Sequence, residues 1–248
     1  MAETALVFKV GGSMVINEQG ANTEYLADCL SPFIDVFSQF DHLAFVIGGG
    51  IRVRILQKTV SSDAEKDEVG IRATHEHADQ LRQVLLGFGL RPASTIPTSP
   101  DEAKQLMAEE PCVVMGGLQI GQSTDAVAAF AFHRFCQAGY DAQLILLSNV
   151  DHIYTADPKK DAQAKPIYSA DIDDLVRQRV LINDPQEWIP GMNITIDPVA
   201  VGLLQRTRTN RAAPIFFTGA DNAEGIMAFL GQHVTQSGTT LSLYQQDK

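Results

Sequence analysis

Cysteine is scarce in this chain of 248 residues, and its three copies lie far apart in the sequence. Cys29, Cys112 and Cys136 form no pair with the spacing of metal ligands, and their odd number implies no disulfide framework. We therefore expect buried, chemically inert thiols, which suit a reducing cytoplasm.

Long apolar runs are missing as well. No stretch approaches the roughly 20 apolar residues that are needed to span a bilayer. The N-terminus also lacks a basic segment followed by a long apolar run, which a secretory signal requires. We expect a cytoplasmic protein that makes no membrane contact.

Positive charge is the third shortage. The chain holds 19 Lys and Arg against 30 Asp and Glu, which gives a net charge of -11 and a pI near 4.9. A general nucleic-acid binder needs a basic face, so this class is excluded. A few cations and backbone N–H groups can still bind phosphate locally. The length suits one large α/β domain over residues 1–248, with 45% apolar residues to fill its core.

Three well-known site motifs are also absent. There is no Gly-x-x-x-x-Gly-Lys-Ser/Thr, so the chain is not a P-loop enzyme. Neither of the first two glycine turns reads Gly-x-Gly-x-x-Gly, which argues against a Rossmann dehydrogenase. His75 and His77, two positions apart on an expected helix, point to different sides and make no zinc pair. We predict no protein metal cluster.

What the chain does contain is a regular alternation of strand-like and helix-like segments. Since strands alternate with helices throughout, we predict a three-layer α/β/α sandwich with a mainly parallel central sheet. Expected strands cover 5–10, 42–47, 112–115, 144–147, 214–217 and 239–243. Expected helices cover 23–40, 68–87, a short segment from Pro100, 125–139, 169–180, 197–205 and 223–230; residues 61–67 read as a loop, and 183–191, with Trp188, as an insertion or flap.

Four of the expected strands end in segments that suit phosphate chemistry. These exits are 9–13, 48–54, 116–125 and 148–160. In an open α/β sheet the carboxyl ends of the strands line one edge, where ligands bind. Glycines there let a phosphate approach the backbone, Lys9 and Arg54 supply positive charge, and Asp125 supplies an acid. This set suits phosphoryl transfer, which needs positioning and charge neutralisation.

Simpler readings of the same residues remain open. Lys9 could be a strand lysine that reaches to solvent along apolar surface. Ser123, Thr124 and Asp125 could be a helix N-cap with an acid favoured by the helix dipole. The polar stretch 148–161 could be a surface loop rich in turn formers.

Taken together, these motifs resemble the amino acid kinase superfamily, and within it the archaeal-type uridylate kinases. The resemblance covers nearly the whole chain and is most specific in the run Tyr-Thr-Ala-Asp-Pro-Lys-Lys-Asp. The motifs are Lys9-Val-Gly-Gly-Ser13, Val46-Ile-Gly-Gly-Gly50, Gly116-Gly117 to Ser123-Thr-Asp-Ala126, Asn149-Val-Asp-His-Ile-Tyr-Thr-Ala-Asp-Pro158, Gly70-Ile71, Ile196-Asp-Pro-Val-Ala200 and Gly238-Thr-Thr240.

The resemblance implies ATP-dependent phosphorylation of UMP to UDP with Mg²⁺, a step of pyrimidine biosynthesis, often in a homohexamer. It implies an acceptor-binding part at roughly 1–140 and an ATP-binding part at roughly 141–248. It also implies that Lys9 stabilises the charge of the transferred phosphoryl group and that Asp125 orients the cationic groups around it.

The same resemblance assigns binding residues. ATP contacts fall on Gly12, Ser13, Gly50, Arg54, Ser148, Asn149, Tyr154 and Asp157. Acceptor contacts fall on Gly49, Asp67, Leu118, Gln119, Ile120, Gly121, Gln122, Ser123 and Thr124, with Asp67 at the ribose and Thr124 near the base.

The chain departs from the family pattern at several places. His152 stands where a glycine is usual; if that position has a positive φ, histidine would be strained by about 1 kcal/mol, and His152→Gly should not harm ATP affinity. Archaeal-type members can carry an acid where Lys9 stands. The loop 118–122, the segment Thr74-His-Glu-His-Ala78 and the Trp188 region are also unusual.

Because these departures cluster near the acceptor and nucleotide sites, two alternatives stay open. The first is a kinase of another small phosphate or carboxylate acceptor. The second is a non-catalytic nucleotide- or oxyanion-binding storage protein on the same fold, since a fold does not determine a function.

Overall fold

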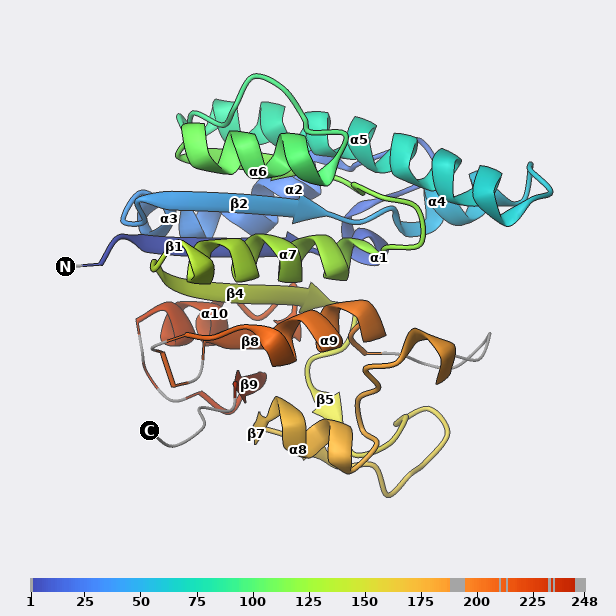
Figure 1. The fold of residues 1–248 in the computed structure, drawn as a ribbon, viewed down its shortest axis with the longest axis vertical. Coiled ribbons are helices and arrows are strands. Elements are labelled where there is room, and N and C mark those ends of the chain that lie inside the picture. Colours follow the sequence, from blue (N-terminus) through green and yellow to red (C-terminus); the bar gives the residue numbers. More distant parts are fainter. Residues whose placement is uncertain are drawn as a thin grey trace.

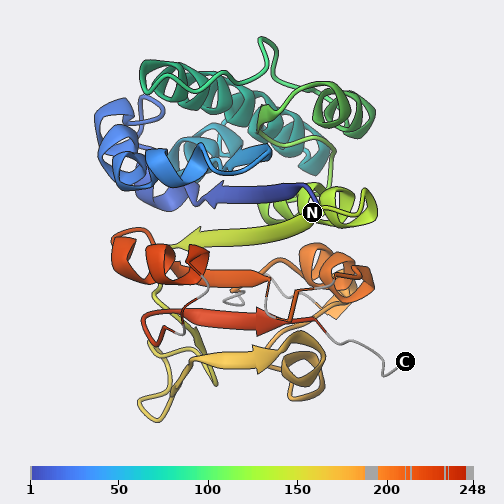
Figure 2. The same cartoon turned by 90° about the vertical axis from the view of Figure 1, so that its left-hand side faces the viewer.

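The structure is a computed structural model, and it describes residues 2–187, 195–209, 211–212, 214–231, 233 and 235–243. A seven-stranded sheet runs through the centre of the molecule, with helices on both of its faces (Figures 1 and 2). This is the predicted three-layer α/β/α architecture. The sheet order is β3 (Cys112–Met115), β2 (His42–Ile47), β1 (Thr4–Val10), β4 (Asp141–Ser148), β8 (Ile215–Gly219), β9 (Thr239–Ser242) and β7 (Ser169–Asp171).

The strands from β3 to β8 in this order are all parallel to their neighbours, and β9 is antiparallel to β8. The prediction of a mainly parallel sheet is therefore confirmed. The described helices are α1 (Gly12–Val15), α2 (Thr23–Leu30), α3 (Ile34–Phe37), α4 (Gly50–Gln57), α5 (Asp63–Gly87), α6 (Pro100–Glu109), α7 (Thr124–Gln137), α8 (Ile172–Arg177), α9 (Pro198–Arg206), α10 (Ala223–Leu230) and two 3-10 turns, Ser31–Phe33 and Pro185–Glu187.

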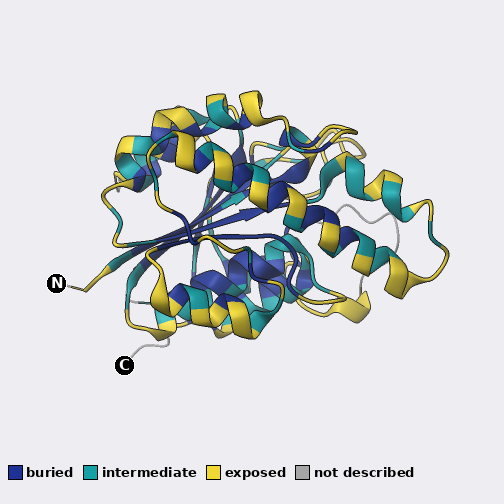
Figure 3. Ribbon diagram, turned by 90° about the horizontal axis from the view of Figure 1, so that it is seen from above, coloured by how far each residue is buried: buried dark blue, intermediate teal, exposed yellow. Residues whose placement is uncertain are grey.

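Alternate residues of each central strand enter different cores, because side chains of a strand point to opposite faces in turn. In β1, Ala5 and Val7 pack with α7 and α9, whereas Leu6 and Phe8 pack with α2, α3, α5 and α10. Figure 3 shows the strands as a buried band between helices whose outer faces are exposed. Lys9 shares the face of Ala5 and Val7, so its side chain leaves β1 toward α7.

The helix expected over 23–40 is broken into α2, a 3-10 turn and α3. Pro32 lies in the 3-10 turn, and proline lacks the N–H that would continue an α-helix. The predicted apolar face survives the break, since Leu26, Leu30, Phe33 and Phe37 are all buried.

The loop expected over 61–67 is wrong for most of its length, because α5 already begins at Asp63. Ser62 and Glu65 form a reciprocal capping box, in which each side chain bonds the other residue's backbone N–H. Such a cap contributes about 1 kcal/mol to a helix start. The mixed charges of this segment are therefore the first turn of a long helix.

The helix expected over 169–180 is also only partly right. Ser169–Asp171 forms β7, a short strand at the edge of the sheet, and the helix α8 covers Ile172–Arg177. The Asp171 side chain accepts N–H bonds from Asp173 and Asp174, which starts the helix there. A small antiparallel pair, β5 (Ile153–Tyr154) with β6 (Pro166–Ile167), was not expected either. Trp188 lies outside the described residues.

The thiols are free, but only Cys112 is buried; Cys29 and Cys136 are half-buried, contrary to the expectation for all three. Burial raises the pKa of the Cys112 and Cys136 thiols to about 12, which keeps them protonated and unreactive. Within the described ranges, no helix combines the length and apolar character that crossing a membrane requires.

Candidate active site

The order of the strands places a cavity at the carboxyl ends of β1 and β4. The chain builds β1, β2 and β3 outward on one side and then returns to add β4 and β8 on the other side of β1. Ligands of open α/β sheets bind where the strand order reverses in this way. A cavity of about 640 Å³ opens there, lined by residues from the exits of β1, β2, β3 and β4.

The first two glycine turns pack against each other, backbone to backbone. A Cβ atom on Gly12 would lie 2.4 Å from the Gly50 nitrogen, and one on Gly50 would lie 2.3 Å from the Gly12 oxygen. Gly50 also has φ +59°, a backbone region that favours glycine. These positions exclude side chains, and so the starts of α1 and α4 lie side by side. The first N–H groups of a helix have no partner within it and can bind anions.

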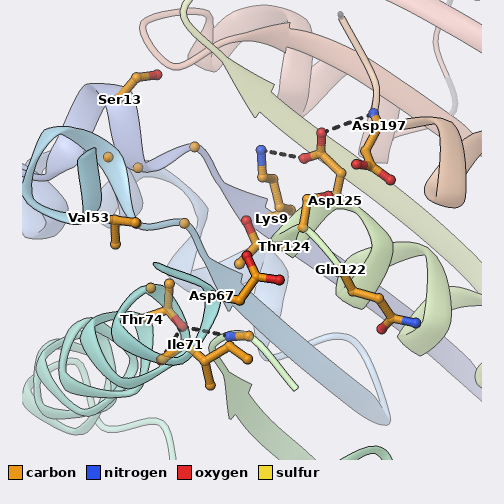
Figure 4. Close-up of a pocket in the computed structure, with 18 of the residues that line it drawn as sticks. Lys9, Ser13, Val53, Asp67, Ile71, Thr74, Gln122, Thr124, Asp125 and Asp197 are labelled. Atoms are coloured by element: carbon orange, nitrogen blue, oxygen red, sulfur yellow. Dashed lines mark hydrogen bonds and ion pairs between the residues drawn. The ribbon is translucent and has the colours of Figure 1, made fainter. Parts of the chain in front are cut away.

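Lys9 and Asp125 form an ion pair in the middle of this cavity (Figure 4). Nζ of Lys9 lies 2.6 Å from Oδ1 of Asp125, and their side chains are 13% and 20% exposed. Ser123 caps α7 by accepting the N–H of Ala126, so Asp125 lies in the first turn of that helix. Asp125 thus holds the ammonium group on the β1 side of the cavity, where a charged ligand would meet it.

A second acid, Asp197, stands next to this pair. Its backbone N–H donates to Oδ2 of Asp125 at 3.4 Å, and its own Oδ1 accepts the N–H groups of Val199 and Ala200 at the start of α9. Burial raises the pKa of Asp197, and the charge of Asp125 adds to this rise, while the two N–H bonds oppose it. The cavity therefore has two carboxyl groups beside one lysine.

One face of α5 forms the opposite wall. Asp67, Gly70, Ile71 and Thr74 all line the cavity, and their spacing of three and four residues places them on one side of a helix. Oδ2 of Asp67 accepts the N–H of Gly121 at 2.8 Å, so this wall also holds the loop after β3.

A smaller cavity of about 190 Å³ lies beyond the end of β4, lined in part by Tyr154, Asp157 and His152. His152 is buried; its Nε2 donates to the Gln236 oxygen at 3.0 Å, and its Nδ1 lies 3.1 Å from Oδ2 of Asp151. Among the described non-glycine residues Arg179 alone has a positive φ, so the strain considered for His152 is not present.

Comparisons with known proteins identify the family of this chain. The profile of the Amino acid kinase family matches residues 4–211. The chain belongs to the amino acid kinase family. The predicted resemblance to this family is thereby confirmed.

Individual relatives carry one recurring name. Uridylate kinase of Methanococcus aeolicus is 27% identical over 96% of this chain and 99% of its own length. Uridylate kinase of Methanospirillum hungatei is 32% identical over 81% of each chain. The crystal structure of uridylate kinase from Archaeoglobus fulgidus matches 98% of this chain and all of its own, with 26% identity and a TM-score of 0.74.

Most of the residues assigned from the family pattern lie together. The main cavity is lined by Lys9, Gly12, Ser13, Gly49, Gly50, Arg54, Asp67, Gln119, Gly121, Gln122, Ser123, Thr124, Asp125 and Ser148. Tyr154 and Asp157 line the smaller cavity instead. Leu118 is buried in the core on the α7 side, Ile120 is 51% exposed, and Asn149 follows Ser148 at the surface.

The wall also contains residues that had no assigned role. Asp197 reads in the sequence as a helix start before Pro198, and nothing in its own neighbourhood connects it with Asp125. The contact arises because α7 and α9 pack on the same face of the sheet (Figure 1). Thr74 could have been found from the sequence, because it lies one helical turn after Gly70-Ile71 on the helix expected over 68–87.

The donor set also fits a magnesium ion held by a substrate. Among the described residues no three His, Cys, Asp or Glu side chains gather closely enough to hold a metal by themselves. Mg²⁺ in kinases is usually bound by one or two carboxylates together with substrate phosphates and water. The carboxyl groups of Asp125 and Asp197, both on the cavity wall, match that requirement.

Proposed function

We propose that this chain transfers the γ-phosphoryl group of ATP to UMP, giving UDP and ADP. The observation that carries the proposal is the single cavity that the ends of β1, β2, β3 and β4 share, with Lys9 and Asp125 inside it. The choice of UMP rests on the relatives and the solved structure that are named uridylate kinase. Transfer between two phosphates needs room for two anionic ligands, which this cavity offers.

In the proposed reaction, positive groups compensate the charge on the transferred phosphoryl. Lys9 reaches the cavity from β1 and is oriented by Asp125. Arg54 also lines the cavity, and within the described chain no acid pairs with its guanidinium, so the group is available for a phosphate. Such groups stabilise a loose phosphoryl transition state without covalent chemistry.

ATP and the acceptor would bind at different walls. We assign the ATP phosphates to the N–H groups at the starts of α1 and α4, and the ATP nucleoside to the side of Ser148, Tyr154 and Asp157. The acceptor lies between Gly49 and the loop 118–124, beside α5. The ATP nucleoside would thus lie on the ATP-binding part expected at roughly 141–248. The part at roughly 1–140 would bind the acceptor and also supply contacts to the ATP phosphates.

Magnesium would be held by the ATP phosphates with Asp125 and Asp197 as the nearest protein carboxylates. When bound, it supplies further positive charge to the phosphate oxygens. The pairing of Asp125 with Lys9 keeps the ammonium in place within the cavity.

A coupled assay of ADP release tests the proposal. The purified chain is given ATP and Mg²⁺ with UMP, CMP, AMP, a small phosphate monoester or a carboxylate in turn. We expect the highest kcat/KM with UMP, with UDP identified by ³¹P NMR. A mock purification from cells that carry an empty vector controls for a contaminating kinase.

Other results would favour the two alternatives. Faster turnover with another acceptor would make the chain a kinase of that acceptor. Binding of ATP or an oxyanion without turnover of any acceptor would favour a binding or storage protein. The family resemblance also predicts a cytoplasmic homohexamer, and sedimentation analysis of the purified chain tests the assembly.

A further inference from the structure

Four consecutive residues of α5, Thr74 to His77, contact the turns after β2 and β3 and the helix α4. Oγ1 of Thr74 accepts the N–H of Gly117 at 2.7 Å. Nε2 of His75 donates to the oxygen of the same Gly117 at 2.7 Å. Glu76 pairs with Arg52 of α4 at 2.6 Å, and Nδ1 of His77 faces the Gly48 oxygen at 3.3 Å. This segment therefore touches the turn after β2, the turn after β3 and α4.

The turn after β3 is held by α5 at two points, Gly117 and Gly121. Gly117 is bonded through both its N–H and its C=O, and Asp67, two helical turns earlier on α5, holds the N–H of Gly121. A Cβ atom on Gly116 would lie 2.7 Å from the Thr74 oxygen, so helix and turn are in direct backbone contact. Figure 4 shows Thr74, Ile71 and Asp67 along this wall.

The bonding partners determine the protonation of both histidines. A carbonyl oxygen only accepts hydrogen bonds, so His75 must carry a proton on Nε2 and His77 must carry one on Nδ1. His77 is fully buried, and its Nε2 has no partner among the residues that the structure describes. Burial lowers the pKa of His77, and the nearby Arg52 adds to this, against the Gly48 bond and Glu76. The neutral form with Nδ1–H is therefore the stable one near neutral pH.

We propose that Thr74, His75 and His77 are positioning residues for the phosphoryl acceptor: they hold the turns after β2 and β3 at the separation that the acceptor needs. The inference rests on the proposed function, which places the acceptor between these two turns. Reacting groups must be held closely, because a misplacement of about 1 Å can cost on the order of 100-fold in rate. The ATP nucleoside side, on β4 and beyond, makes none of these contacts. The start of α4, which we assign to the ATP phosphates, follows directly on the turn that His77 holds.

Matched variants test the two histidines. His77→Leu removes the donor at similar size, whereas His77→Asn keeps a donor near the Nδ1 position. His75→Leu and His75→Gln form the corresponding pair for Nε2. We expect each Leu variant to raise the KM of the acceptor at least tenfold. The KM of ATP should change less than twofold in His75→Leu. In His77→Leu it should rise less than the KM of the acceptor, because the Gly48 turn adjoins the start of α4. The Asn and Gln variants should recover most of the loss.

Amide hydrogen exchange of the ligand-free chain gives a readout that needs no activity. In the Leu variants, protection should fall at residues 48–50 and 116–122 and stay unchanged at 148–157. Unchanged protection at the two turns, or an equal loss at all three segments, would refute the positioning role. Equal increases in the KM of ATP and of the acceptor would refute it as well.

The design separates this inference from the proposed function. If the wild-type chain prefers another acceptor, the KM comparison uses that acceptor. If it turns over no acceptor at all, the amide hydrogen exchange measurement alone tests the positioning role. Should His77→Leu fail to fold, Thr74→Val and Thr74→Ser supply a matched comparison for the turn after β3. Serine keeps the hydroxyl that accepts the Gly117 N–H, and valine removes it.

Discussion

The ammonium of Lys9 lies 2.6 Å from the carboxylate of Asp125, although one side chain comes from the first strand and the other from a helix in the middle of the chain. The period of two in β1 directs Lys9 to the α7 face, and Ser123 starts α7 where Asp125 can meet it. In the proposed reaction, this contact would let Asp125 position the lysine for phosphoryl transfer.

Replacing this acid tests its role directly. Asp125→Asn should cut kcat at least tenfold, because the amide no longer attracts the ammonium of Lys9. The fold should remain, since Ser123 still caps α7. Circular dichroism and thermal unfolding check the fold, and initial rates check kcat. Wild-type activity in a folded variant would remove Asp125 from the mechanism.

Gly12 should tolerate no side chain. The Cβ of Gly12→Ala would lie 2.4 Å from the Gly50 nitrogen, and backbone cannot move away as a flexible side chain can. We expect a loss of about 1–3 kcal/mol in the free energy of unfolding, together with a large loss of activity.

Gly87→Ala is the matched control. Gly87 ends α5, and its added Cβ would have no heavy atom within 4 Å, so stability should be unchanged or slightly higher. Urea titration of both variants gives the comparison. Equal stability of the two would contradict the backbone packing of the glycine turns.

Asp197→Asn should stabilise the chain at neutral pH. The raised pKa means that the folded state favours the neutral acid: its contribution to stability is full below the unfolded value of about 3.9 and is lost as pH rises through the folded pKa. Asparagine keeps a capping oxygen for α9 and removes the charge beside Asp125. We expect a gain of up to about 1 kcal/mol at pH 7.

This gain should shrink as pH falls from the folded pKa toward the unfolded one, because the native acid then becomes neutral. Urea titrations at pH 7 and at mildly acidic pH measure the difference. Asp197→Ala, which also removes the N-cap of α9, should instead lose stability at both pH values. A gain that does not vary with pH would mean that charge is not its cause.

His152 should support ATP binding. Its ring donates to the Gln236 oxygen and makes edge-to-face contacts with Tyr154 and Tyr168, so it connects the loop after β4 with the segment before β9. His152→Ala should therefore raise the KM of ATP several-fold and leave the KM of the acceptor nearly unchanged, with partial recovery in His152→Gln.

A strained histidine at position 152 would predict the opposite effect on ATP affinity. Since the φ of His152 is not positive, His152→Gly should weaken ATP binding as His152→Ala does, rather than improve it. Calorimetric titration with a non-hydrolysable ATP analogue measures the affinity. Tighter binding by the glycine variant would show that the ring obstructs the nucleotide.

Local patterns in the sequence were sufficient for the alternation of strands and helices, the four strand exits and the lysine and acid of the site. Apolar runs, glycine turns and helix caps act over a few residues, so they can be read from the chain itself. The same is true of α6, which begins at Pro100 as expected, with Ser99 as its N-cap. Where one local signal competed with another, as at Pro32 and Ser62, the element boundaries were wrong.

Tertiary structure alone decided which of these residues meet. The contact of Asp197 with Asp125 requires α9 to pack beside α7, and the contacts of His75 and His77 require α5 to cross the turns after β2 and β3. Ser169–Asp171 forms a strand because its backbone pairs with the edge of β9. Such contacts join segments that are distant in the chain, and they form only when burial of the two cores brings those segments together.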